Sequence, residues 1–402
     1  MAKISGFEQD CQTAIGVLRA ALMGLYAAVE APTDQPQEVS RAFKLNKNLT
    51  WKISKLMTTA DAADALQYLP GVSGMKIFLR AMESAGAASG LLSEVRDAYA
   101  QLEQTVQVHV GDRSTLELVL DGLGPARSER LEVSRKLAFR GMSGVWGVQA
   151  RAKLTIALIK PSDEDGSMLE LAFARGFVGF RRLRSELSWP ISVRRDWVGE
   201  GEPVDQVWEP LEPGEAVNGL PILRDYTTHP MPAFELRRVP DGVCYTLPPG
   251  PVGNTAALDC LFSDVLRAGT PRYRSESDRH GEIVSGITVP VEHQLTDIIY
   301  HRGFADPLEA EALIYGDPFG NQRMISGDPS QYRLPISERV VDLPGAPPIV
   351  ATPLFAGYPR LLTRIFDRLG WEPREFRGVR LQTRYPPMGT NVSVRFDLPE
   401  RP

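Results

Sequence analysis

The chain has 402 residues, a net charge of −5 at pH 7, 43% hydrophobic residues and 24% charged residues. These proportions are ordinary for a globular protein with a buried core, so they exclude a wholly disordered chain, and the length suggests about two or three domains. The three cysteines lie far apart with no CxxC pair, which excludes a disulfide framework and a cysteine-based zinc site and indicates a reducing cytoplasm.

The N-terminal segment MAKISGFEQDCQ lacks the basic start and apolar core of a secretory signal. The first long apolar run, residues 14–29, is interrupted by Arg19, and we expect it to be too short to span a bilayer. These features predict a cytoplasmic protein without a membrane partner.

Proline divides the chain into two parts. Five of the 32 prolines lie before residue 186, and all the others lie from Pro190 onward. Because proline breaks helix interiors, the first part can hold long helices and the second part can hold few. The sequence therefore predicts a multidomain α+β fold, with a helical bundle over residues 1–145 and a β-rich domain over residues 146–402.

The first part shows apolar residues at three- and four-residue spacing, which is typical of amphipathic helices. A short basic stretch, with Ala42 and Asn46 on either side of a turn, forms part of this helical region. The remaining predicted helices cover residues 7–29, a short segment from Pro36, and residues 62–68, 73–83, 91–108, 112–120 and 128–142.

From Val148 the pattern changes to alternation, as in VQARAKLTIALI, which predicts a strand. Many short strands separated by Gly, Pro or Asp indicate an antiparallel sandwich or barrel. We expect two helices to interrupt it, over residues 255–267 and over residues 359–369 with Gly370 as the C-cap. The predicted strands cover residues 148–159, 168–183, 188–198, 234–239, 242–247, 282–291, 295–301, 312–316, 337–343, 379–385 and 392–398.

The stretch VSRAFKLNKNLTWKISKLM, residues 39–57, has five basic residues and no acid in a chain that is acidic elsewhere. A net-acidic protein needs such a local patch to bind nucleic acid. Two short helices are expected here, with Asn46 as the N-cap of the second. That second helix would pack through Leu49, Ile53 and Leu56. The alternative interpretation is a helical pair with a solvated basic face.

Residues 38–57 resemble the helix-turn-helix of bacterial transcription regulators. In this resemblance Ala42 is the small residue at the helix crossing, and Leu45 is the hydrophobic residue of the turn. The sequence departs from the usual pattern at Lys44, where glycine commonly permits a positive φ, so we expect a longer or differently shaped turn. It also departs at Thr50, where a core hydrophobe is common and whose role Leu49 could take.

The resemblance implies that double-stranded DNA is the partner and that the second helix enters the major groove. Basic side chains would contact phosphates, and polar or aromatic ones would read base edges. The phosphate-contacting candidates are Lys47, Lys52 and Lys55, and the candidates for sequence selectivity are Asn48, Thr50 and Trp51. Arg41 and Lys44 complete the predicted DNA-binding set.

This set predicts a DNA-binding transcriptional regulator whose β-rich domain senses an effector or forms a homo-oligomer, preferably a dimer. The alternative is a structural protein that assembles through its β-rich domain and uses the helical part as an adaptor. A third hypothesis, an enzyme with its site in the β-rich domain, has no supporting motif, because no GxSxG, Walker, Rossmann, kinase or HExxH pattern occurs. We expect neither a cofactor nor a metal.

Two segments are rich in basic residues. The first segment is a predicted helix and contains Arg127, Arg130, Arg135, Lys136 and Arg140. It could form internal pairs along its helix, Arg130 with Glu129 or Glu132 with Lys136. The second is predicted to form strands and contains Arg175, Arg181, Arg182, Arg184, Arg194 and Arg195. It could extend a nucleic-acid surface or bind an anionic partner, although the wet face of a sheet would show the same pattern.

His293, Asp297 and His301 are spaced by four residues, which on a helix would align metal ligands. The segment is β-branched and predicted to be a strand. On a strand the three side chains would spread over roughly 26 Å, which is too far for one metal. The segment YRSESDRHGE, residues 273–282, is interpreted as a polar loop and not as a catalytic triad.

Overall fold

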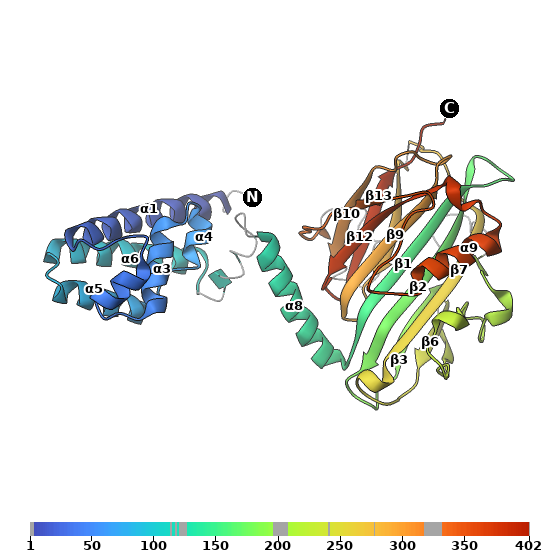
Figure 1. The fold of residues 1–402 in the computed structure, drawn as a ribbon, viewed down its shortest axis with the longest axis horizontal. Coiled ribbons are helices and arrows are strands. Elements are labelled where there is room, and N and C mark those ends of the chain that lie inside the picture. Colours follow the sequence, from blue (N-terminus) through green and yellow to red (C-terminus); the bar gives the residue numbers. More distant parts are fainter. Residues whose placement is uncertain are drawn as a thin grey trace. The chain divides into compact units, whose positions relative to one another are not determined.

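A computed structural model of the chain describes residues 4–112, 115–116, 119, 127–195, 208–239, 242–276, 278–316 and 332–401. The protein has an α+β fold, in which a helical region is followed by a region rich in β-sheet (Figure 1). It consists of two compact units, unit 1 over Met1–Ser134 and unit 2 over Arg135–Pro402. The division lies within helix α8 (Arg127–Trp146), eleven residues before the expected boundary at 145.

Unit 1 is built from helices that share one apolar core. Leu18, Leu22 and Leu25 of the first helix are fully buried in it. The predicted helix over 112–120 lies largely outside the described residues. The helices are α1 (Ile4–Ala28), α2 (Pro36–Ala42), α3 (Lys47–Thr58), α4 (Ala62–Leu66), α5 (Val72–Ser84) and α6 (Ser89–His109).

Helix α1 contains a stretch, Gln9–Ala28, that is long and apolar enough to cross a membrane. The run at residues 14–29 is thus mostly part of a longer apolar stretch, which passes this test by length and composition only. Arg19, which interrupts the run, donates to the backbone oxygens of Leu56 and Thr59. Leu18 and Tyr26 pack in the core of unit 1, as expected of the central helix of a globular domain.

Unit 2 contains a seven-stranded sheet in the order β11-β12-β9-β1-β2-β7-β4 and two three-stranded sheets, β10-β13-β8 and β3-β6-β5. The pair β1–β9 is parallel, so the expectation of a wholly antiparallel arrangement is wrong at this position. The strands are β1 (Val148–Pro161), β2 (Met168–Arg182), β3 (Trp189–Arg195), β4 (Trp208–Pro210), β5 (Glu235–Val239), β6 (Gly242–Leu247), β7 (Leu258–Pro271), β8 (His280–Gly286), β9 (Val291–His301), β10 (Ala310–Gly316), β11 (Val341–Leu343), β12 (Phe376–Arg384) and β13 (Thr390–Asp397).

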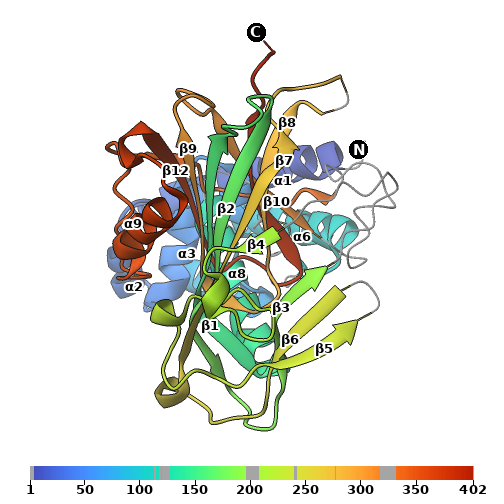
Figure 2. The same ribbon diagram turned by 90° about the vertical axis from the view of Figure 1, so that its right-hand side faces the viewer.

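The seven-stranded sheet is covered on both faces (Figure 2). Helix α9 (Tyr358–Leu369) packs on one face, where Leu361 and Ile365 meet Leu154 and Ile156 of β1. Side chains of the two small sheets pack on the opposite face around residues such as Ala157. Unit 2 is therefore a layered structure whose central sheet has two apolar sides. Helix α9 ends at Gly370 in the left-handed conformation, as the sequence predicts.

The helix expected over residues 255–267 is wrong, because this segment forms strand β7. Its apolar residues fall at helical spacing only because β7 is buried on both faces, which removes the two-residue alternation of a half-exposed strand. Cys260 and Phe262 point into the core beside the small sheets, and Leu261 and Val265 point into the core beneath α9.

Candidate functional site

The turn between α2 and α3 is tight. The N–H of Phe43 donates to Val39 O at 3.0 Å, and the N–H of Leu45 donates to Ser40 O at 3.0 Å. Lys44 between them has φ of 51°, so the helix ends in a Schellman-type cap with a left-handed residue. The expectation of a longer turn is therefore wrong, because Lys44 itself adopts the conformation that glycine would favour.

Helix α3 begins at the predicted cap. The side chain of Asn46 accepts a hydrogen bond from the N–H of Asn48 at 2.8 Å. This bond satisfies one of the amide groups that have no partner within the first turn of a helix. Leu45 is buried immediately before it, as expected for the hydrophobic residue of the turn.

Two residues of the predicted motif lie elsewhere than expected. Ala42 is exposed and does not pack at the helix crossing, where Ser40 is buried and donates to Leu45 O at 2.7 Å. Thr50 is completely buried, and its hydroxyl donates to Lys47 O at 3.1 Å. Thr50 lies three residues before Ile53 on the packed face of α3, so its assignment to base reading is wrong.

The other predicted residues that lie on α3 share one exposed face. Residues at i, i+1, i+4, i+5 and i+8 fall within an arc of roughly 140° at 100° per residue. Trp51 is 43% exposed near the centre of this face, and its ring meets Tyr68 edge-on at 5.3 Å. We call the face, together with the two exposed residues before it, the α3 face; its members are Arg41, Lys44, Lys47, Asn48, Trp51, Lys52 and Lys55.

The α3 face carries only positive charge. Among the residues that the structure describes, no carboxylate forms an ion pair with Lys47, Lys52 or Lys55. Their ammonium groups therefore remain available to an anionic partner. Burial lowers the pKa of the Arg19 guanidinium, and the carboxylate of Asp61, which follows α3, opposes this only in part.

The basic residues at 127–140 are partly engaged within their own units. Arg130 pairs with Asp64 of α4 in unit 1. Arg135 is buried in unit 2 and donates to Glu338 Oε1 at 2.8 Å. Arg140 is exposed. This segment therefore contributes structural ion pairs beside any role on a surface.

The arginines at 175–184 are held by contacts inside unit 2. Arg175 donates to Asp264 at 2.9 Å, and Arg181 donates to Asn254 at 2.6 Å. Arg182 is buried and bonds the backbone oxygens of Leu187 and Pro248, and Arg184 donates to Val145 O. The side chains of Arg194 and Arg195 lie outside what the structure describes.

The residues considered as metal ligands lie on strand β9 and bond to other groups. Asp297 is completely buried and accepts two hydrogen bonds from Arg380, at 2.9 and 2.7 Å, and one from Tyr358 at 2.8 Å. Burial raises the pKa of the Asp297 carboxyl, and these three donors oppose that rise. His301 hydrogen-bonds with Glu375 at 2.9 Å. Within the described ranges, no group of three His, Cys, Asp or Glu residues could hold a metal.

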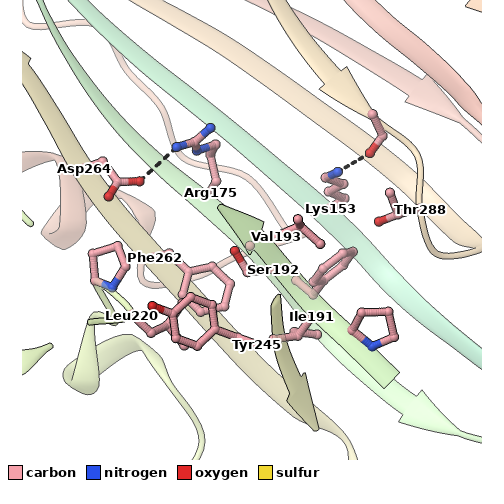
Figure 3. Close-up of a pocket in the computed structure, with 15 residues that line it drawn as sticks. Lys153, Arg175, Ile191, Ser192, Val193, Leu220, Tyr245, Phe262, Asp264 and Thr288 are labelled. Carbon is pink, nitrogen blue, oxygen red and sulfur yellow. Dashed lines mark hydrogen bonds and ion pairs between the residues drawn. The ribbon is translucent and has the colours of Figure 1, made fainter. Parts of the chain in front are cut away.

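A pocket of about 390 Å³, which sequence reasoning missed, opens between the seven-stranded sheet and the small sheet β3-β6-β5. Figure 3 shows Asp264, Arg175, Lys153 and Thr288 along one side and apolar side chains along the other. We call it the inter-sheet pocket. The one sequence signal was Lys153, a lysine within the apolar strand β1. The apolar lining residues include Phe177, Ile191, Leu220, Tyr245 and Phe262.

No family model and no curated protein matches this chain. It is similar to one solved structure, the crystal structure of a "putative protease" from Parabacteroides distasonis, with 8% sequence identity. The likeness covers 62% of this chain and 40% of that chain, so it spans less than half of the other protein, and the TM-score is 0.27. A score this low carries no argument about fold or function.

Proposed function

We propose that this protein is a cytoplasmic DNA-binding transcriptional regulator. Unit 1 binds duplex DNA through the α3 face, and unit 2 acts as an effector-sensing or oligomerisation domain. The observation that carries the proposal is the arrangement of α2, the tight turn and α3, which exposes five cations and no acid on the α3 face.

Each part of the α3 face suits a distinct role on DNA. Lys47, Lys52 and Lys55 are flexible cations that contact phosphates and supply affinity without sequence selectivity. Asn48 lies between them, and its amide can form two hydrogen bonds with the major-groove edge of an adenine, by accepting from N6 and donating to N7. The ring of Trp51 can make an apolar contact with the methyl group of a thymine in the major groove. Thr50 has no role on DNA in this proposal, because its side chain is buried.

The buried face of α3 explains how the cations are presented. Ile53, Leu56 and Met57 anchor the helix in the core of unit 1, and Ser54 donates to Thr33 O at 2.7 Å. These contacts fix the rotation of α3 about its axis, so the opposite side must face solvent. A rigid helix that presents one polar face is what insertion into a groove requires.

A homodimer follows from the small size of the module, because one helix-turn-helix reads few bases and buries little surface. Light scattering of the full chain is expected to give a discrete dimer or a monomer that dimerises on DNA. Large particles would contradict the regulator and favour an assembly protein built through unit 2.

The test is fluorescence anisotropy of a labelled random duplex titrated with the full chain at two salt concentrations. Replacing Lys47, Lys52 and Lys55 with Ala is expected to weaken binding to every duplex and to lower the salt slope by roughly 2 to 3, at about 0.9 per phosphate contact.

The matched control replaces three exposed basic residues of α5 and α6, Lys76, Arg80 and Arg96, with Ala. This variant loses the same charge from the same unit, so it is expected to retain the affinity and the slope of the parent. If both variants lose the same affinity, binding depends on the net charge of unit 1 and not on the α3 face. If the parent shows no salt-sensitive binding to DNA, the proposal is refuted.

A further inference from the structure

Among the described residues that line the inter-sheet pocket, one cation has no carboxylate partner. Lys153 projects from β1, donates to Gly286 O, and lies 5.6 Å from the centroid of the Phe177 ring (Figure 3). Burial, and then the nearby Arg175 guanidinium, lower the pKa of the Lys153 ammonium to about 8. A carbonyl oxygen and an aromatic face stabilise this ammonium only in part, because neither carries a full negative charge.

The second cation of the pocket is already neutralised. Arg175 from β2 donates to Asp264 of β7 at 2.9 Å, and its guanidinium lies 5.0 Å from the Phe173 ring centroid. Asp264 is the only carboxylate among the described residues that line the pocket. The lining therefore carries one net positive charge, which is located at Lys153.

The opposite side of the pocket is apolar. The side chains that face the space are Ile191 of β3, Tyr245 of β6, Phe262 of β7, and Leu220 from the segment between β4 and β5. A volume of about 390 Å³ falls in the range of small-molecule sites, which are mostly apolar with a few placed polar groups. A ring system of one or two fused rings has the size to fill it.

We propose that the inter-sheet pocket binds a small molecule that carries one anionic group, a carboxylate or a sulfonate-like group, on a flat apolar body. The anion pairs with Lys153, and the body lies against Phe262, Tyr245 and Ile191. A cationic ligand would meet two positive groups, and an uncharged one would leave the Lys153 ammonium buried without a counter-ion. The proposal concerns unit 2 alone and does not rest on DNA binding.

The probe is 8-anilinonaphthalene-1-sulfonate, which has one permanent negative charge and fused aromatic rings. Its fluorescence is titrated with the full chain and with a Lys153→Met variant, whose side chain keeps a similar length without the charge. We expect one saturable site per chain and a loss of at least about tenfold in affinity in the variant, because a charge-assisted contact is removed.

The matched control is Lys160→Met on the same strand. Lys160 pairs with Asp163 and lies over Trp371, outside the pocket lining. This variant is expected to bind the probe like the parent. If Lys153→Met and Lys160→Met bind the probe as tightly as the parent, the proposal is overturned.

A second measurement uses only the parent protein, so it remains decisive if Lys153→Met fails to fold. The probe is displaced with 2-naphthoate and with 2-naphthamide, which share a ring system and differ in charge. We expect the carboxylate to compete at least about tenfold better than the amide. Equal competition, or a parent that binds no probe, would exclude an anion-selective pocket.

The pH dependence gives a third readout. The probe stays ionised at all relevant pH values, so its affinity is expected to fall as pH rises above about 8, where Lys153 loses its proton. The other charged groups that line the pocket are Arg175 and Asp264, which form an ion pair with each other. An affinity that stays constant through this range would contradict the role of Lys153.

Discussion

Lys44 shows how a residue that looks unsuitable for a turn can still complete it. Its φ of 51° lies in the region that costs an L-residue about 1–2 kcal/mol relative to an ordinary helical conformation. The hydrogen bond from Leu45 to Ser40 and the burial of Leu45 hold the turn in this conformation. A charged side chain at this position is consistent with a role in binding, since glycine would fit the backbone better.

The substitution Lys44→Gly distinguishes the effect of this residue on the stability of the turn from the effect of its charge on DNA binding. The substitution relieves the left-handed strain but increases the flexibility of the unfolded chain, so we expect unit 1 to gain up to about 1 kcal/mol of stability. It also removes one cation from the α3 face, so affinity for duplex DNA is expected to fall and the salt slope to decrease by about 1. Denaturant unfolding and anisotropy measure the two effects.

Lys44→Ala is the control for this prediction. It removes the same charge but keeps the strained backbone, so its DNA affinity should match that of Lys44→Gly while its stability does not rise. A Lys44→Gly protein less stable than Lys44→Ala would show that the left-handed conformation is not what this turn adopts.

At the scale of elements, a buried ion pair ties the loop before α9 to the central sheet. Arg380 of β12 bonds Asp297 of β9 and also donates to Val350 O at 2.9 Å, and Tyr358 at the start of α9 donates to Asp297. Burial opposes the charge of Arg380, but the hydrogen bonds and the charge of Asp297, together with Tyr358, outweigh burial, so the pKa of Arg380 lies above its usual value. Asp297, which the sequence suggests as a metal ligand, is therefore held by Arg380 and Tyr358.

Asp297→Asn is expected to destabilise unit 2 by about 3–5 kcal/mol, because it leaves the charge of Arg380 buried without a counter-ion. Tyr358→Phe keeps the ion pair and removes one donor, so its expected cost is about 1 kcal/mol. Thermal unfolding of both variants provides the comparison. Similar losses from the two substitutions would mean that the ion pair does not dominate this cluster.

At the scale of the whole molecule, the two units have separate cores. The core of unit 1 is formed by side chains of its helices, and unit 2 has one core on each face of its central sheet. A core that is complete within one unit can melt without the other. The division of the chain therefore has a thermodynamic consequence.

We expect calorimetry of the full chain to show two transitions. Lys44→Gly should raise only the midpoint of unit 1, and Asp297→Asn should lower only that of unit 2, by roughly 2–4 °C per kcal/mol for a unit of this size. A single transition displaced by both substitutions would contradict independent units.

Much of the fold was predictable because it depends on neighbouring residues. Proline distribution, helical spacing and strand alternation locate most elements, and local chemistry identifies Asn46 as the N-cap of α3 and Gly370 as the C-cap of α9. The exposed cations of α3 could also be predicted, because its apolar residues mark the face that packs. These features arise from backbone preferences and periodicity within about one or two helical turns.

The remaining features depend on segments far apart in the sequence. Thr50 is buried because it lies on the side of α3 that packs in the core of unit 1, and β7 resembles a helix because layers cover both of its faces. The parallel pairing of β1 with β9 and the contact of Lys153 with Gly286 join residues more than a hundred positions apart. By itself the sequence determined the order and type of most elements and the basic face of α3. Only the tertiary structure decided which polar groups were buried, which were paired, and where a pocket formed, because burial and pairing are set by the packing of distant segments.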